Sequence, residues 1–213
     1  MKLSLARANY GAMKYLSILA ALVLASCAPH AAPKVMDGDI IFHTSKSSQS
    51  LAIQRATGSR YSHMGLIFMR AGKPFVFEAV SPVKYTPLDQ WIARGAGGHY
   101  VLKRLKNAAP LLTPIALQRL RKAAGKFVGR PYDLGFAWSD DRMYCSEIVW
   151  KLIDRELGVR VGELQKIRDF NLSDPTVRAK MRERYGANIP MEEPVISPAA
   201  MFDSKTLVTV GEG

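Results

Sequence analysis

A loop turns into a helix in the sequence Asp141-Arg142-Met143-Tyr144-Cys145-Ser146-Glu147-Ile148-Val149-Trp150. Apolar residues with the spacing of an amphipathic helix follow the cysteine, at Ile148, Val149, Leu152 and Ile153. We therefore expect a helix that begins near Cys145 and ends at Gly158. A thiol in the first helical turn lies near unpaired N–H groups and the positive end of the helix dipole, which favour the thiolate. The position suits a nucleophile, although most free cysteines are small buried apolar residues.

The N-terminal segment has the pattern of a secretory signal. Lys2, Arg7 and Lys14 precede an apolar run over 16–24, and no acidic residue occurs before Asp37. The apolar run is too short for an ordinary membrane span. We therefore predict a signal peptide over 1–26, a tether over 27–36 and a single catalytic domain over 37–213.

The signal ends in Leu24-Ala25-Ser26-Cys27, and small residues before a cysteine resemble the lipobox of bacterial lipoproteins. The alternative is a plain signal peptide with an incidental cysteine. If Cys27 carries lipid, Cys145 is the one thiol left in an oxidising compartment, which favours a reactive role for it. Ala28 rather than aspartate follows Cys27, so we expect a lipid anchor in the bacterial cell envelope, on the periplasmic face of the outer membrane.

The formal net charge of the chain is +12. At a membrane, such a charge indicates contact with anionic head groups or envelope polymers. No basic run interleaved with aromatic residues occurs, so nucleic acid is not an expected partner. The oligomeric state is not indicated by the sequence.

A predicted hairpin places a histidine and a glutamate together. The strand 62–68 is followed by the turn residues 71–74 and by a second strand over 75–80. A two-residue loop at 70–71 puts His63 opposite Glu78, and a four-residue loop at 70–73 puts it diagonal to Glu78. Both registers leave the two side chains on one face, whereas a three-residue loop without a bulge separates them. Glu78 lies between apolar residues, where a charge is costly unless it is paired.

Other polar residues are weaker candidates. Asp39 can orient a catalytic group but is more typical of a turn-capping aspartate, and His99 is a second candidate base without an acidic neighbour. His43 lies just beyond the first predicted strand, over 37–42. Four scattered histidines and one free cysteine have no recognisable metal-ligand spacing, so we expect neither a metal nor another cofactor.

The rest of the chain predicts further elements and a substrate wall. Helices are expected over 51–56, from Pro87 at the first helical position, over 113–127 and over 174–185, with an edge strand over 207–210 and a flexible loop over 95–98. An aromatic-rich loop precedes the cysteine. Three residues there are candidates for a substrate wall: Tyr132, Trp138 and Tyr144.

The three residues Cys145, His63 and Glu78 make a cysteine–histidine–acid set. The imidazole takes the thiol proton, and the carboxylate fixes the tautomer of the imidazole. Backbone N–H groups at the helix start, including that of Cys145, are placed to hold an oxyanion.

Several short motifs also resemble a known family. They are Gly38-Asp39-Ile40-Ile41-Phe42, Ser62-His63-Met64-Gly65, Phe77-Glu78-Ala79, Pro131-Tyr132-Asp133 and Tyr144-Cys145-Ser146-Glu147. In this order they look like the YiiX/YebB/YaeF group, which are permuted papain-like amidases of the NlpC superfamily. The resemblance covers 37–158. It implies an α+β fold in which a small antiparallel sheet packs against helices, with the nucleophile Cys145 at a helix N-terminus, the base His63 and the third polar residue Glu78.

The resemblance and the residues together predict a cell-envelope cysteine hydrolase. It would form an acyl-enzyme at Cys145 on an amide or ester, such as a peptidoglycan peptide, an N-acyl amino acid or a lipid. The alternatives are a lipid acyltransferase and a non-catalytic envelope-binding lipoprotein that retains the fold. The complete set of residue types favours an enzyme.

Overall fold

The structure is a computed structural model that describes residues 34–213. These residues belong to one compact unit. The predicted signal peptide, Cys27 and most of the predicted tether lie outside the described residues. Among the helices of 34–213, none is both long and apolar enough to cross a membrane.

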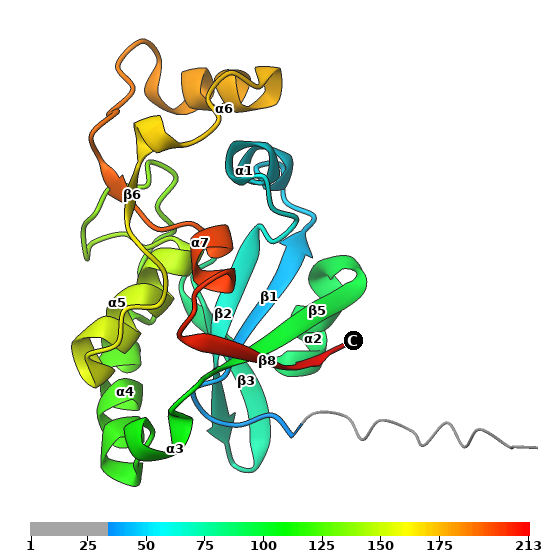
Figure 1. The fold of residues 1–213 in the computed structure, drawn as a ribbon, viewed down its shortest axis with the longest axis vertical. Coiled ribbons are helices and arrows are strands. Elements are labelled where there is room, and N and C mark those ends of the chain that lie inside the picture. The colour runs from blue at the N-terminus through cyan, green and yellow to red at the C-terminus, as the bar shows by residue number, and fades with distance from the viewer. Residues whose placement is uncertain (1–33) are drawn as a thin grey trace, which may run out of the picture. The chain divides into compact units, whose positions relative to one another are not determined.

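A six-stranded antiparallel sheet forms the centre of the fold, with the strand order β4-β3-β2-β1-β5-β8 (Figure 1). Its strands are β1 (Ile40–Ser45), β2 (His63–Arg70), β3 (Lys73–Glu78), β4 (Lys84–Pro87), β5 (Gly95–Leu105) and β8 (Leu207–Glu212). Strand β8 pairs with β5 at the edge of the sheet. The edge strand expected over 207–210 is therefore confirmed.

The helices are α1 (Ser50–Thr57), α2 (Leu88–Arg94), α3 (Ala108–Leu111), α4 (Pro114–Phe127), α5 (Cys145–Leu157), α6 (Pro175–Tyr185) and α7 (Pro198–Phe202). The short strands β6 (Gln165–Lys166) and β7 (Pro194–Val195) pair with each other, and a 3₁₀ turn covers Ile167–Asp169. Helix α4 begins with Thr113 as its N-cap, and α5 ends at Gly158 in the left-handed conformation. Both boundaries follow the capping signals in the sequence.

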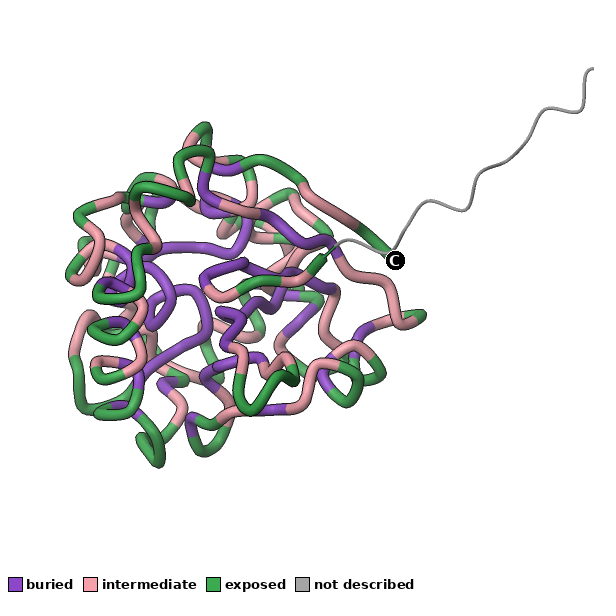
Figure 2. Tube along the Cα trace, turned by 90° about the horizontal axis from the view of Figure 1, so that it is seen from below, coloured by how far each residue is buried: buried purple, intermediate pink, exposed green. Residues whose placement is uncertain are grey.

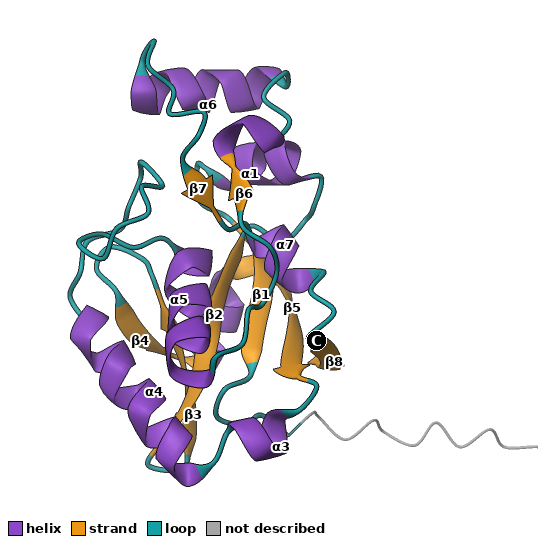
Figure 3. Ribbon diagram, turned by 60° about the vertical axis from the view of Figure 1, so that its left-hand side comes forward, coloured by secondary structure: helices purple, strands orange, loops and turns teal. Residues whose placement is uncertain are grey.

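The two faces of the sheet are covered differently. Helix α5 packs on β2 and β3, and α4 packs against α5 (Figure 3). This face carries alternate strand residues such as Phe42, Leu66 and Phe77. The other face carries Ile41 and Ile67 around the fully buried Trp91 of α2. Figure 2 shows the resulting interior, where buried segments are surrounded by exposed loops.

The expected fold class is confirmed: the protein is α+β, with a small antiparallel sheet packed against helices and Cys145 as the first residue of α5. Two local predictions were wrong. Gly95–Gly98 begins strand β5 rather than forming a flexible loop, because Gly95 pairs with Ser45 at the end of β1. Helix α2 begins at Leu88, one residue later than expected, because Thr86 belongs to β4 and pairs with Val76.

Candidate active site

The β2–β3 hairpin sets the relation between His63 and Glu78. Its turn is Ala71-Gly72, and both residues have positive φ angles, of 49° and 75°, as a two-residue type I′ turn requires. Arg70 pairs with Lys73 and Leu66 with Phe77. Continuing this register leaves His63 diagonal to Glu78, on the same face, which is the register expected for a loop over 70–73.

Gly65 allows the two strands to approach closely at this point. A Cβ atom on Gly65 would lie 2.3 Å from Cγ1 of Val76 and 2.8 Å from the carbonyl oxygen of Phe77. It would also lie 3.5 Å from Cβ of Glu78. The absence of this side chain lets the Glu78 carboxylate reach His63, and the Nε2–Oε2 distance is 2.7 Å.

The Glu78 carboxylate is fully buried and accepts four hydrogen bonds. Besides His63, its donors are Thr86 Oγ1 at 2.5 Å, Trp91 Nε1 at 3.0 Å and the Arg94 guanidinium. Burial alone would raise the pKa of Glu78, but the hydrogen bond and charge of His63, with the Thr86 hydrogen bond and Arg94, lower it to about 2. Glu78 is therefore a carboxylate held by donors from β2, β4 and α2.

His63 lies between this carboxylate and Cys145. Burial lowers the pKa of His63, but hydrogen bonds to Cys145 and Glu78, with the negative charges of both, raise it to about 9. Nε2 is bound to Glu78, which leaves Nδ1 to exchange a proton with the thiol. Cys145 is 3% exposed and opens helix α5, and its N–H has no acceptor among residues 34–213. The structure thus brings Cys145, His63 and Glu78 together, as the sequence predicts.

His43 lies beside this set. It pairs with His63 across β1 and β2, and its ring stacks on Trp91 at a centroid distance of 3.8 Å. Burial and the positive charge of His63 lower the pKa of His43 to about 3. The neutral ring fits against Gly95, where a Cβ atom would lie 2.8 Å from its Nδ1. His43 therefore fills space beside His63 without adding a second charge.

The weaker candidates lie away from Cys145. Asp39 binds Arg104 in a two-pronged ion pair, with distances of 2.6 and 2.8 Å, and accepts the N–H of Met36. It caps a turn, as its sequence position favours. His99 lies in β5 and lines neither of the two pockets described next.

Two pockets flank the cysteine–histidine pair. The first encloses about 620 Å³ of empty space, its open mouth included, and Cys145 lies in its wall. Its lining is almost entirely apolar and includes Ile53, Phe136, Phe170, Val177, Met181 and Ile196. The second contains His63 and carries the basic and polar side chains of Lys46, Arg94 and Gln49 with several serines, beside apolar residues such as Leu134. We call them the apolar pocket and the basic pocket.

Two of the three predicted wall residues line these pockets. Tyr132 lines both, and Tyr144 lines the apolar pocket. Trp138 lines neither. Its ring packs edge-on against Trp150 at 5.5 Å and lies under the ammonium group of Lys151. The loop folds back over α5 at that point, so Trp138 supports the helix instead of facing the site.

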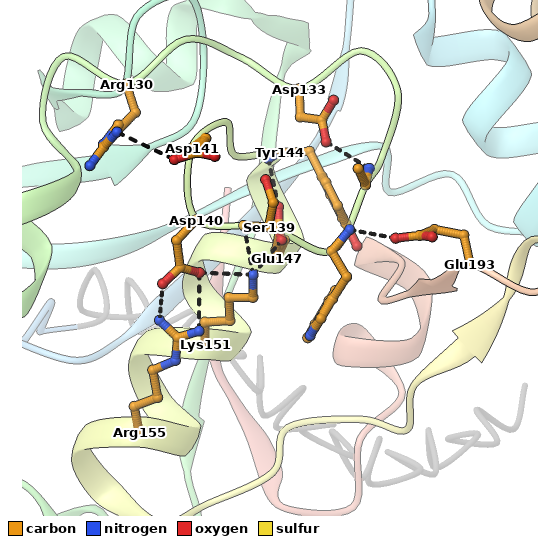
Figure 4. Close-up of polar contacts among 12 residues, drawn as sticks. Arg130, Asp133, Ser139, Asp140, Asp141, Tyr144, Glu147, Lys151, Arg155 and Glu193 are labelled. Atoms are coloured by element: carbon orange, nitrogen blue, oxygen red, sulfur yellow. Dashed lines mark hydrogen bonds and ion pairs between the residues drawn. The ribbon is translucent and has the colours of Figure 1, made fainter. Parts of the chain in front are cut away.

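A buried ion pair holds the loop that leads to Cys145 (Figure 4). Glu147 accepts the N–H of Tyr144 at 3.3 Å and the Lys151 ammonium at 2.7 Å. Lys151 also binds the carbonyl of Ser139 at 2.7 Å and the carboxylate of Asp140 at 3.0 Å. Burial raises the pKa of Glu147 to about 7, and the Lys151 hydrogen bond and charge only partly oppose this. The pair holds the loop that leads to Cys145, which we call the approach loop, against the helix that carries the nucleophile.

The acidic, histidine and cysteine side chains of the described residues are engaged in other contacts or lie apart. Within 34–213, no three or more His, Cys, Asp or Glu side chains converge in a way that could hold a metal ion. His63 and Glu78 bind each other, and Asp39 forms an ion pair with Arg104. These residues do not fit a metal centre.

Two relatives share most of the chain. The protein YiiX from Escherichia coli strain K12 is 55% identical over 175 residues, which cover 82% of this chain and 85% of that protein. A crystal structure of YiiX from Escherichia coli O157:H7, described as a metalloprotein, is 56% identical with a TM-score of 0.79. The match covers 84% of this chain and 97% of that chain.

A family model matches residues 34–211, which span the sheet, both pockets and the helix opened by Cys145. Its description is a permuted papain-like amidase enzyme, YaeF/YiiX, of the C92 family. The order His63, Glu78, Cys145 along the chain is the permuted order that the sequence resemblance implied. With this match and the two relatives, the chain belongs to the permuted papain-like amidase family YaeF/YiiX, C92.

Proposed function

We propose that the protein is a thiol-dependent hydrolase that forms an acyl-enzyme at Cys145 on an amide or ester substrate. The observation that carries the proposal is the hydrogen-bonded pair of His63 and Glu78 beside a cysteine at a helix N-terminus. This set supplies a nucleophile, a proton carrier and a group that orients the carrier. The family description as an amidase supports the same reaction class.

The reaction follows from the positions of the groups. His63 takes the thiol proton, the Cys145 sulfur attacks the acyl carbon, and the carbonyl oxygen becomes an oxyanion near the N–H of Cys145, which has no acceptor among residues 34–213. The imidazolium of His63 then gives its proton to the leaving amine as the bond between carbon and nitrogen breaks. Water attacks the thioester and gives a proton to His63, the acid is released as the bond between carbon and sulfur breaks, and the thiolate–imidazolium pair of Cys145 and His63 is restored. The described residues do not fit a metal centre, so no step is assigned to one.

The two pockets support an assignment of the two substrate halves. The acyl group becomes bonded to Cys145, whose side chain lies in the wall of the apolar pocket. The leaving group receives its proton from His63, which lies in the basic pocket. An apolar acyl chain joined to a polar or anionic leaving group fits this arrangement. Lipids and N-acyl amino acids share this chemistry, and a peptidoglycan peptide lacks the apolar acyl part.

The acyl assignment can be tested with p-nitrophenyl esters of acetate, butyrate and octanoate. Each methylene group buried in an apolar site contributes about 0.8 kcal/mol, so second-order acylation should rise by roughly fourfold per methylene until the pocket is filled. Cys145→Ala is the control and should release no p-nitrophenol above background. Acetate reacting as fast as octanoate would contradict an apolar acyl pocket.

We also propose that the protein is held at the envelope membrane by lipid on Cys27. This residue lies outside the described part of the chain, and the proposal rests on the signal-like segment and Leu24-Ala25-Ser26-Cys27. An anchored enzyme would meet lipid-like substrates at the surface where they occur. From Cys27 onward the formal net charge is +9, which is +12 less the three cations Lys2, Arg7 and Lys14, and it is consistent with an anionic membrane surface.

A further inference from the structure

Helix α6 contributes no member of the Cys145–His63–Glu78 set, yet one of its faces forms part of the site. Val177 and Met181 line the apolar pocket. Arg184 lies one helical turn further along the same face. Its guanidinium binds the side-chain oxygen of Gln49 and stacks on Phe136 at 4.6 Å. Figure 1 shows α6 beside α1, which Gln49 precedes.

The Arg184 contact determines how the Gln49 amide points. A guanidinium has only donors, so the group that faces it must be the amide oxygen, Oε1. The amide nitrogen, Nε2, is thereby directed to Tyr132 and donates to its hydroxyl oxygen at 2.8 Å. The chain of contacts runs from α6, through the start of α1, to the loop before the nucleophile.

This arrangement leaves the Tyr132 hydroxyl with a proton to donate. Its oxygen accepts from Gln49, and among residues 34–213 no acceptor for its own proton is present. Burial, and then the negative charge of Cys145, raise the pKa of Tyr132, so the phenol stays protonated. Tyr132 lines both pockets, at the junction where the reacting carbonyl must lie.

We propose that Gln49 and Arg184 are positioning residues that aim the Tyr132 hydroxyl at the acyl oxygen, where it stabilises the oxyanion together with the Cys145 N–H. The inference rests on the proposed acyl-enzyme chemistry and adds a function for α6. Without Gln49, the phenol could rotate and donate its proton elsewhere. A hydrogen bond made in advance costs no reorganisation during the reaction, which is why such donors are effective.

A purely structural role for these contacts must be separated from this one. Gln49→Glu makes the distinction because the carboxylate keeps the size of the side chain and its pairing with Arg184. It has no proton to donate, so Tyr132 would turn its own proton toward residue 49 and away from the substrate. If the contact between Gln49 and Arg184 only held α1 and α6 together, Gln49→Glu would preserve it and leave acylation unchanged.

The experiment is a double-mutant cycle of Gln49→Glu and Tyr132→Phe in the full chain. The measured quantity is the rate of single-turnover acylation by p-nitrophenyl octanoate divided by the rate of alkylation by iodoacetamide. Alkylation uses the same thiol but forms no oxyanion. Tyr132→Phe should lower this ratio by about 100-fold, the usual effect of one lost oxyanion donor. Gln49→Glu should lower it in the wild-type background and have no further effect when Tyr132 is already Phe. Arg182→Gln, on the exposed side of α6, is the matched control and should leave the ratio unchanged.

Three results would overturn the inference. An unchanged ratio in Tyr132→Phe would remove the hydroxyl from catalysis. Equal losses from Gln49→Glu in both backgrounds would show that Gln49 does not act through Tyr132. A wild-type protein that alkylates but is never acylated would refute the proposed function, and this inference with it, whereas the first two results leave the acyl-enzyme proposal intact.

Discussion

Replacing Glu78 by glutamine tests how the carboxylate holds the site. Each of its two oxygens accepts two donors: Oε2 from His63 and Trp91, and Oε1 from Thr86 and Arg94. Glutamine has only one oxygen at this position, and its NH₂ group must face the other two donors. Whichever way the amide turns, two donors lose their acceptor: either the buried His63 and Trp91, or the buried Thr86 together with Arg94, whose side chain is 44% exposed.

The size of the effect follows from this count. A buried donor left without an acceptor costs about 1–3 kcal/mol, so the free energy of unfolding falls by about 2–6 kcal/mol if His63 and Trp91 lose their acceptor, and by about 1–3 kcal/mol if Thr86 and the water-accessible Arg94 do. Thr86→Val is the matched control, because it removes one neutral donor and leaves the carboxylate with three. It should cost only about 1 kcal/mol.

Urea denaturation at pH 7, followed by far-ultraviolet circular dichroism, measures both losses. If Glu78→Gln is no less stable than Thr86→Val, the four-donor account of the carboxylate is wrong. Acylation by the folded fraction should also fall, by up to about four orders of magnitude if the imidazole adopts the wrong tautomer. A folded Glu78→Gln protein that acylates at the wild-type rate would make Glu78 a structural carboxylate only.

Further predictions concern pH, the approach loop and the anchor. Because the pKa of His63 is raised to about 9, the imidazolium that protonates a leaving amine is present below that pH and is lost above it. Acylation by an amide substrate should fall as pH rises through about 9, and a pH–rate profile that stays flat there contradicts the role of His63 as the acid. The pKa of Glu147 is raised from 4.5 to about 7, so the folded protein binds a proton that the unfolded chain releases in this range. Its contribution to stability is complete below pH 4.5 and is lost as pH rises to about 7, by roughly 3 kcal/mol. Glu147→Gln should remove this slope from denaturation curves, and an unchanged slope would assign it to another group. Labelled palmitate should enter the wild-type protein in cells but not Cys27→Ala, and equal labelling of the two would refute the lipid anchor.

Local features of the sequence were enough to predict the nucleophile helix and the hairpin. Side chains alternate along a strand, so the parity of the turn at 70–73 decides whether His63 and Glu78 share a face, whatever surrounds them. The capping signals at Thr113 and Gly158 are equally local: α4 begins after Thr113, and α5 ends at Gly158. This is why the candidate residues could be grouped from the sequence.

The contacts that complete the site could not be predicted in this way. Thr86 has the pattern of a helix cap, and only the pairing of β4 with β3 turns its hydroxyl to Glu78. Gln49 and Arg184 are 135 positions apart, and no periodicity relates them. Trp138 was expected to face the substrate, but the path of its loop over α5 places it on Trp150. Each of these positions depends on tertiary packing rather than on a local pattern.

The central claim is that Cys145 carries the acyl group, with His63 as its proton carrier. The most direct measurement is mass spectrometry of the protein after a short reaction with an acyl ester, followed by peptide mapping. We predict one acyl group per chain, on the peptide that contains Cys145, together with no adduct in Cys145→Ala and a much slower one in His63→Ala. An acyl group on any other residue, or equal acylation of wild type and Cys145→Ala, would contradict the account.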